Sequence, residues 1–232
     1  PWLGIFAEGA RASVRLAQAR FEGVAAAGSA AGAAVMAQGG ASLSIERVVV
    51  RGSRGAGIVA ISGEHSFDCV TIVDGASGIV LEEAKGALEN TRLERLSGDG
   101  LSIRAAAAPG IRVAALTVRD ALGAGLHVRD AAVELETVEL SACGRGIDAT
   151  GRSDIVLRGG RLAGNDVAIV VGESARNERT ARSGAPRVEI IATEILPHVE
   201  LWRVATGAKV IWRGAEVPTN APVPAGVELL EK

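Results

Sequence analysis

The chain has 232 residues, of which 48% are hydrophobic but only 3% aromatic, and its formal net charge is −2. This balance excludes a disordered chain, a broadly basic nucleic-acid-binding surface and, with only two cysteines, a disulfide-dense scaffold. Its apolar runs all fall short of the roughly 20 residues that a membrane-spanning helix needs, so we expect one or two domains, no nucleic-acid partner and no membrane insertion.

The first eleven residues precede the pattern that organises the rest of the chain. They include Trp2, Leu3, Ile5 and Phe6, which are apolar enough to plug the end of a fold. We therefore expect residues 1–11 to form an N-terminal cap or a junction to a missing upstream region.

From residue 12 to residue 229, one template recurs about every 22 residues. It reads apolar, any, apolar, two residues, small or apolar, any, apolar, and we take its second apolar position as the anchor. Repeats of this length are typical of solenoids, in which stacked units bury a continuous core. The anchors are Leu16, Ile45, Phe67, Leu88, Val113, Leu135, Leu157, Ile190 and Trp212.

A second short block, Gly-apolar-any-apolar, completes the repeat. Alternation over so few residues predicts short strands with one buried face. We expect the glycine to supply a positive φ at a tight corner before the strand. The block begins at Gly57, Gly78, Gly100, Gly125 and Gly146, with variants at Asp166, His198 and Gly226.

Three short strands per repeat describe a coil that pairs in parallel with the coils above and below it. The pattern resembles the right-handed parallel β-helix, the pectate-lyase-like superfold. The resemblance implies an all-β solenoid of about nine coils over residues 12–229, with a surface loop at 172–187 and a tail at 230–232. The superfold is associated with polysaccharide lyases, hydrolases and epimerases, and also with tailspikes, adhesins and non-catalytic envelope proteins, so it specifies fold rather than function.

The outward positions of the second block carry the main candidate site. Ser102, His127 and Asp148 fall on three consecutive coils, in the order of a nucleophile, a base and an orienting carboxylate. Arg104 and Arg129 follow in the next outward row and could bind a uronate carboxylate. The full row reads Val59, Val80, Ser102, His127, Asp148, Ala168, Glu200 and Glu228.

The same residues also fit a solvated ladder of surface side chains. Glu82, at the edge of the patch, would then form an ordinary surface ion pair with Arg104. A flat and exposed Ser–His–Asp row would also lack the water exclusion that catalysis needs.

A row of acids beside the anchors offers a second candidate site. Glu46, Asp68 and Glu89 lie on adjacent coils, and clustered carboxylates could bind Ca²⁺. Ordinary acidic solvation is the alternative, and we expect no other cofactor. Cys69 and Cys143 lie three coils apart, too far for a disulfide.

The motifs of the catalytic families are missing, as are tyrosines for a sugar-binding platform. We therefore expect a non-catalytic structural or interaction domain of a larger bacterial envelope or secreted protein, outside the cytoplasm, that binds a polysaccharide or a protein partner. The alternatives are a uronate lyase or epimerase centred on His127 and a carbohydrate-binding module without chemistry. Outward apolar residues also predict an oligomer or partner surface. They are Val49, Val59, Val73, Val80, Ile191 and Ile211.

Overall fold

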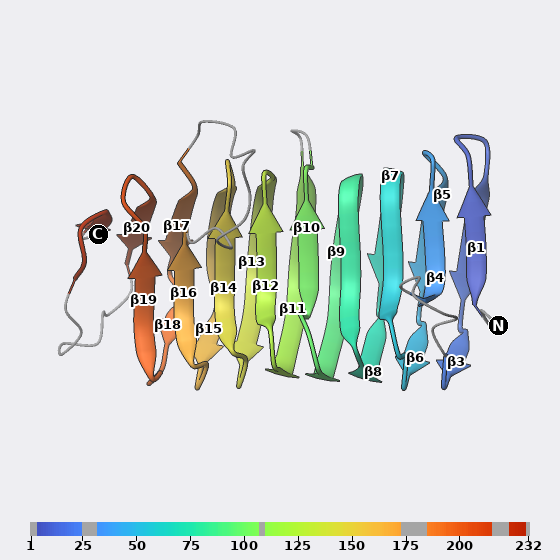
Figure 1. Cartoon of the computed structure of the whole chain (residues 1–232), viewed down its shortest axis with the longest axis horizontal. Coiled ribbons are helices and arrows are strands. Elements are labelled where there is room, and N and C mark those ends of the chain that lie inside the picture. The colour runs from blue at the N-terminus through green and yellow to red at the C-terminus, as the bar shows by residue number, and fades with distance from the viewer. Residues whose placement is uncertain (1–3, 25–31, 107–109, 173–184, 215–222, 231–232) are drawn as a thin grey trace.

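The computed structural model describes residues 4–24, 32–106, 110–172, 185–214 and 223–230. Each turn of the chain adds one strand segment to each of three stacks, which we call sheets A, B and C. Every strand pairing among the described residues is parallel. In Figure 1 the strands of sheet A run upward in front while the chain advances from right to left, so the coil is right-handed.

Sheet A contains the second block of the repeat and faces the viewer in Figure 1. Its strands are β1 (Ile5–Glu8), β4 (Ala33–Gln38), the first parts of β7 (Ala56–Asp68) and β9 (Ser77–Leu96), β10 (Leu101–Arg104), β12 (Ala124–Arg129), β14 (Arg145–Thr150), β16 (Val167–Val171) and β19 (Glu200–Val204).

Sheet B contains the anchors. Its strands are β2 (Ser13–Ala17), β5 (Ser42–Glu46), later parts of β7 and β9, the first parts of β11 (Ile111–Ala121), β13 (Ala132–Ser141) and β15 (Asp154–Ala163), and β17 (Arg187–Ile191), β20 (Lys209–Arg213) and β21 (Val227–Leu230).

Sheet C is the shortest of the three. Its strands are β3 (Arg20–Glu22), β6 (Val49–Arg51), β8 (Thr71–Gly75), the ends of β9, β11, β13 and β15, and β18 (Glu194–Ile195). The described residues therefore form about eight full turns, slightly fewer than the nine predicted. They contain no helix that could cross a membrane.

The anchor column is confirmed along its whole length. Each anchor from Leu16 to Trp212 pairs with the next one in sheet B. The apolar residues five positions later pair in the same way in sheet C, as Leu93 does with Val118. Most of these side chains are fully buried in one continuous apolar core. Burial of this core is the main favourable free energy of the fold.

Two columns of left-handed residues turn the chain on either side of sheet C. One column lies two positions after the anchor and the other lies seven positions after it. Several members are not glycines, such as Asn90 at φ 47° and Arg95 at φ 52°. A single residue at positive φ turns a strand sharply without a loop. The columns are Gln18, Arg47, Cys69, Asn90, Ala115, Thr137, Gly159, Ala192 and Gly214, and Gly23, Gly52, Asp74, Arg95, Asp120, Ala142 and Gly164.

The glycines that begin the second block have a different role from the expected one. None of Gly57, Gly78, Gly100, Gly125 and Gly146 has a positive φ, so the expectation is wrong for these five, whereas Gly226 in the last variant of the block has a φ of 91°. A Cβ on Gly100 would lie 2.5 Å from a methyl carbon of Val118 and 2.7 Å from the carbonyl oxygen of Gly125. These glycines are needed for space, because the next coil and the neighbouring sheet come too close for a side chain.

The structure also corrects the outward row beyond Asp148. Asp148 pairs with Val170, which pairs with Arg203, so Ala168 and Glu200 do not belong to this row. The alternation of apolar residues fits more than one register, and only packing against buried neighbours decides between them. Within this region the sequence pattern therefore predicted the strands but not their register.

At its N-terminal end the β-helix begins earlier than residue 12. Strand β1 already pairs with β4, so the helix includes residues 5–8 and the predicted cap at 1–11 is in part its first strand. Glu228 lies in sheet B opposite Ile211, not in the row of His127. Most of the predicted loop at 172–187, and residues 1–3 and 231–232, lie outside the described residues.

Candidate functional site

The fold brings the three predicted residues together on sheet A. Ser102 pairs with His127, and His127 pairs with Asp148, on strands β10, β12 and β14. They form the polar centre of an outward row whose other members are mostly apolar. From β1 to β19 the row reads Phe6, Met36, Val59, Val80, Ser102, His127, Asp148, Val170 and Arg203.

This polar centre is not the exposed ladder that the sequence indicated. Ser102 is 3% exposed and Asp148 only 2%, while the His127 side chain is 19% exposed. Buried polar groups need hydrogen-bond or charge partners. We therefore expect each of the three side chains to have a partner.

His127 has a carboxylate partner that sequence reasoning missed. Its Nδ1 lies 3.3 Å from Oδ2 of Asp99, and Oδ1 of Asp99 accepts a hydrogen bond of 2.8 Å from the backbone N–H of Ala124. The next coil leaves room for this carboxylate because it has Gly123 there, where a Cβ would lie 2.3 Å from Asp99 Oδ1. Asp99 precedes β10 at a corner, outside the strand template, so no repeat position marked it.

The electrostatics of Asp99 favour its charged form. Burial by itself would raise the pKa of Asp99, but the hydrogen bonds from His127 and Ala124 and the charges of His127 and Arg145 together lower that pKa. An ionised Asp99 that accepts the Nδ1 proton leaves Nε2 of His127 as the ring atom available to a ligand. The pair is thus oriented for proton transfer or for binding an anion when the ring is charged.

Ser102 and Asp148 have other partners. Ser102 Oγ accepts a hydrogen bond of 3.3 Å from Arg104 Nε, and Asp148 Oδ2 forms an ion pair of 2.6 Å with Arg145 Nη1. Within the described ranges His127 has no hydrogen bond to Ser102. The residues lie in the predicted order, but the geometry does not activate Ser102 as a nucleophile.

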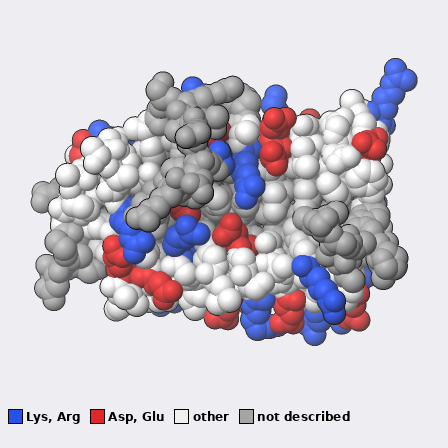
Figure 2. Space-filling view, in the orientation of Figure 1, with Lys and Arg blue, Asp and Glu red and all other residues white. Residues whose placement is uncertain are grey.

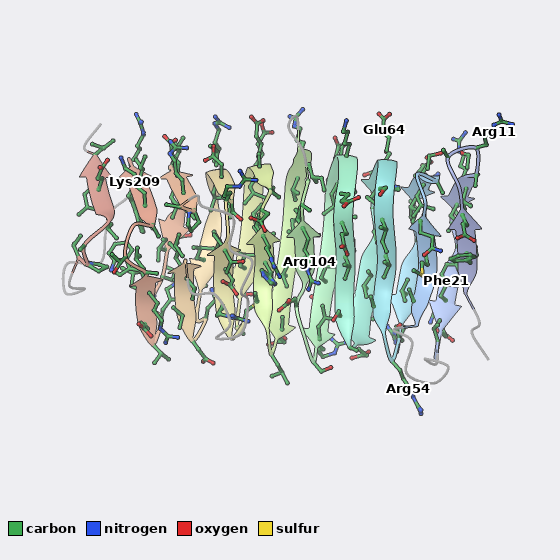
Figure 3. All side chains as sticks on the ribbon, turned by 45° about the horizontal axis from the view of Figure 1, so that its top comes forward. Arg11, Phe21, Arg54, Glu64, Arg104 and Lys209 are labelled. Atoms are coloured by element: carbon green, nitrogen blue, oxygen red, sulfur yellow. The ribbon has the colours of Figure 1, made fainter. Side chains whose placement is uncertain are left out.

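Two arginines lie beside this centre in the next outward row. Arg104 pairs in register with both Arg129 and Glu82, and Figure 3 shows it near the middle of the stack. In the part of the chain that the structure describes, Glu82 forms no ion pair with Arg104, so the predicted surface pair is absent. Arg129 Nε lies 3.6 Å from Asp130 Oδ2. Like charges on adjacent strands repel each other, and a bound anion would relieve that repulsion.

The acidic row on sheet B has the predicted register but does not form a metal centre. Glu46 pairs with Asp68, and Asp68 pairs with Glu89. Asp68 accepts a hydrogen bond of 2.8 Å from Asn90, and Glu46 forms an ion pair of 2.7 Å with Arg47. No group of three acids, histidines or cysteines among the described residues could hold a metal ion. The described residues of this row therefore lack the ligand set of the predicted Ca²⁺ site.

The remaining candidate site residues lie in the core or away from the row of Ser102, His127 and Asp148. Cys69 and Cys143 are free thiols, and burial raises the pKa of Cys143 to about 11. His65 is buried, accepts a hydrogen bond from the N–H of Leu43 and stacks on Phe67.

A hollow of about 300 Å³ lies on sheet B rather than sheet A. Its lining includes Arg112, Glu134 and Asp154.

The outward apolar residues do not form one face. Val59 and Val80 are neighbours on sheet A. Val49 and Val73 lie on sheet C, and Ile191 and Ile211 lie on sheet B. The predicted apolar sheet face is therefore wrong for the set as a whole, and only the pair on sheet A continues into a longer apolar row.

Fold and site together define a right-handed parallel β-helix with a polar centre on sheet A. No protein-family model and no curated protein matches the chain. A solved structure that it is similar to is the crystal structure of pectate lyase Pel9A, with 13% sequence identity and a TM-score of 0.45. The similarity covers 83% of this chain and 61% of that one. The chain thus spans less than two thirds of the length of that lyase.

Proposed function

We propose that this protein is a non-catalytic β-helix that binds an acidic polysaccharide on sheet A, over β10, β12 and β14. The observation that supports the proposal is the pair Arg104 and Arg129 on neighbouring strands beside His127. Arg104 is exposed and lacks a carboxylate partner within the described ranges. Its guanidinium can therefore donate to a uronate carboxylate in the two-pronged geometry that arginine favours.

A role in binding acidic polysaccharide also suits an extracytoplasmic protein. Such polymers are found in bacterial envelopes and outside cells, and the proposal therefore includes a periplasmic or secreted location. The protein would then act as a structural or interaction domain that holds the polymer.

Calorimetric titration with oligouronates and with neutral oligoglucans tests the binding proposal. We expect the oligouronate alone to bind, and we expect Arg104→Ala to weaken it by about tenfold, the effect of losing one charge-assisted contact. Arg158→Ala is the matched control, because Arg158 is an exposed arginine on sheet B. Equal losses in both variants, or no binding by the wild-type protein, would overturn the proposal.

A second candidate function rests on the hydrogen-bonded Asp99–His127 pair. In a uronate lyase, Nε2 of His127 would take the C5 proton, the C4–C5 double bond would form as the C4–O bond breaks, and the leaving oxygen would take a proton from water, which gives an unsaturated uronate. Arg104 or Arg129 would stabilise the charge on the uronate carboxylate. Ultraviolet absorbance of the unsaturated product tests this candidate. Product that disappears in His127→Ala would replace the non-catalytic proposal, and no product from pectate or alginate would exclude a lyase.

A further inference from the structure

The outward row of sheet A changes its chemistry at one point. From β10 to β14 it is polar, with Ser102, His127 and Asp148, but on the four coils that precede β10 it is apolar throughout. The apolar members are Phe6, Met36, Val59 and Val80. In Figure 2, which looks onto sheet A, charged side chains of both signs lie over the middle strands and over the strands on their C-terminal side.

The apolar row reaches the corner of the coil on one side. Two positions before Met36 and Val59 the chain faces the core, because Ala34 is fully buried and a Cβ on Gly57 would lie 2.6 Å from the side chain of buried Ile72. Two positions after the members of the row lie longer side chains, among them Gln38 and Glu82. We call the row from Phe6 to Val80 the apolar strip, and longer side chains border it on one side. Phe6, at its far end, is 45% exposed.

The length of the strip matches one chemical class of ligand. Four coils at about 4.8 Å per step span roughly 14 Å from Val80 to Phe6. Half of the hydrocarbon core of a bilayer is about 15 Å thick, so an extended lipid chain has the length of the strip. The strip ends at Arg104, Arg129 and His127, which would meet an anionic head group.

Glu82 fixes the position of that head group. It follows Val80 by two residues on the same strand and pairs in register with Arg104. Its carboxylate repels an anion from the coil of β9 and so directs it to the coils of β10 and β12. An apolar chain that leaves this head group along the row meets Val80 first and Phe6 last.

We propose that the ligand of sheet A is an amphiphile, an acidic saccharide attached to a hydrocarbon chain. The saccharide carboxylate binds Arg104 and Arg129, and the hydrocarbon chain covers the strip from Val80 to Phe6. This inference rests on the proposed function, because it keeps the same anion site and adds the chemistry of the rest of the ligand.

Three probes separate the contributions of head and chain. They are dodecyl glucuronide, free glucuronate and dodecyl glucoside, titrated into the full chain below their micelle concentrations. We expect dodecyl glucuronide to bind at least about tenfold more tightly than either of the others, because burial of several methylenes adds to the charge contact. Binding of dodecyl glucuronide no tighter than that of glucuronate overturns the inference. Equal binding of the glucoside and the glucuronide overturns it as well, because the head group then contributes nothing.

Variants with little change in shape test the place of binding. Val59→Thr with Val80→Thr should weaken dodecyl glucuronide about fivefold to tenfold and leave an oligouronate unchanged, and circular dichroism checks that the variant is folded. Val49→Thr on sheet C is the matched control and should change neither ligand. An unchanged affinity for dodecyl glucuronide in the double variant overturns the inference. If oligouronates still bind, the proposed function stands without it, whereas no binding of any acidic probe removes both.

Discussion

Sheets A and C have the same strand spacing but use their outer faces differently. On sheet C, acids and arginines compensate one another, within one strand as in Arg92–Glu94 and between adjacent strands as in Arg161–Glu194. On sheet A, Arg104 and Arg129 stand side by side, and the described acids nearby contact His127, Arg145 and Arg129 rather than Arg104. Charge that is neutralised locally is typical of a solvated face, and an arginine without a carboxylate partner next to an apolar strip, as Arg104 is within the described ranges, is typical of a binding face.

The largest effect should come from the core that both faces share. Val113→Asp should lower the free energy of unfolding by about 4 kcal/mol or more, or prevent folding, because it buries a carboxylate without a partner. Val113 is fully buried at its anchor position. Urea denaturation measures the change. Thr117→Asp, on the outward side of the same strand, is the control, and equal stabilities of the two variants would contradict the register.

The next largest effect concerns the glycines that separate sheet A from the neighbouring coil. Gly100→Ala should cost about 1–3 kcal/mol, because its Cβ would overlap Val118 and the backbone of Gly125. Gly159→Ala should cost only about 1 kcal/mol, since Gly159 has a positive φ but nothing within 4 Å of a Cβ. Thermal unfolding compares the two. A larger loss for Gly159→Ala would mean that backbone conformation, not space, limits these positions.

Removing the charge of Asp99 should have a smaller and pH-dependent effect. Because the folded-state pKa of Asp99 is lowered, its stabilisation is complete above the unfolded pKa of about 4 and is lost as the pH falls through the folded pKa. Asp99→Asn should therefore be less stable than wild type by about 1–2 kcal/mol at neutral pH, with the difference shrinking below pH 4. Unfolding followed by circular dichroism from pH 7 to pH 2.5 measures it. Asp166→Asn, at an exposed corner, is the control, and a difference that does not vary with pH would argue against the Asp99–His127 contact.

The smallest effect should be seen on sheet C. Arg161→Ala removes an ion pair of 3.4 Å whose side chains are 49% and 61% exposed. Such a pair contributes about 0.5 kcal/mol or less, so thermal unfolding at low and high salt should barely distinguish the variant from wild type. A loss above 1 kcal/mol would show that sheet C is more than a solvated face.

The sequence was sufficient to predict the fold because the anchor residues determine how successive coils align. A large apolar residue about every 22 positions can stack only on its equivalents, and every anchor from Leu16 to Trp212 does so. Where the repeat unit weakens after Asp148, alternation alone assigned Ala168 to a position that Val170 occupies.

The same reasoning predicted only part of the candidate site. Rows on adjacent coils placed Ser102, His127 and Asp148 together correctly. The partner of His127 was missed because Asp99 lies at a corner, and its contact depends on the absence of a side chain at Gly123 in the following coil. Such a contact depends on three-dimensional packing and leaves no periodic signal in the chain.

The two left-handed columns divide each coil into a part of fixed length and a part of variable length. From the anchor to the second left-handed residue the count is constant in every described coil from Leu16 to Gly164, whereas the spacing between successive anchors varies from 21 to 33 residues. All of that variation therefore lies outside the segment from the anchor to the second left-handed residue, which includes sheet C. For protein engineering, the corners on either side of sheet A are therefore the places to graft a peptide. The segment from the anchor to the second left-handed residue should tolerate substitutions but not insertions.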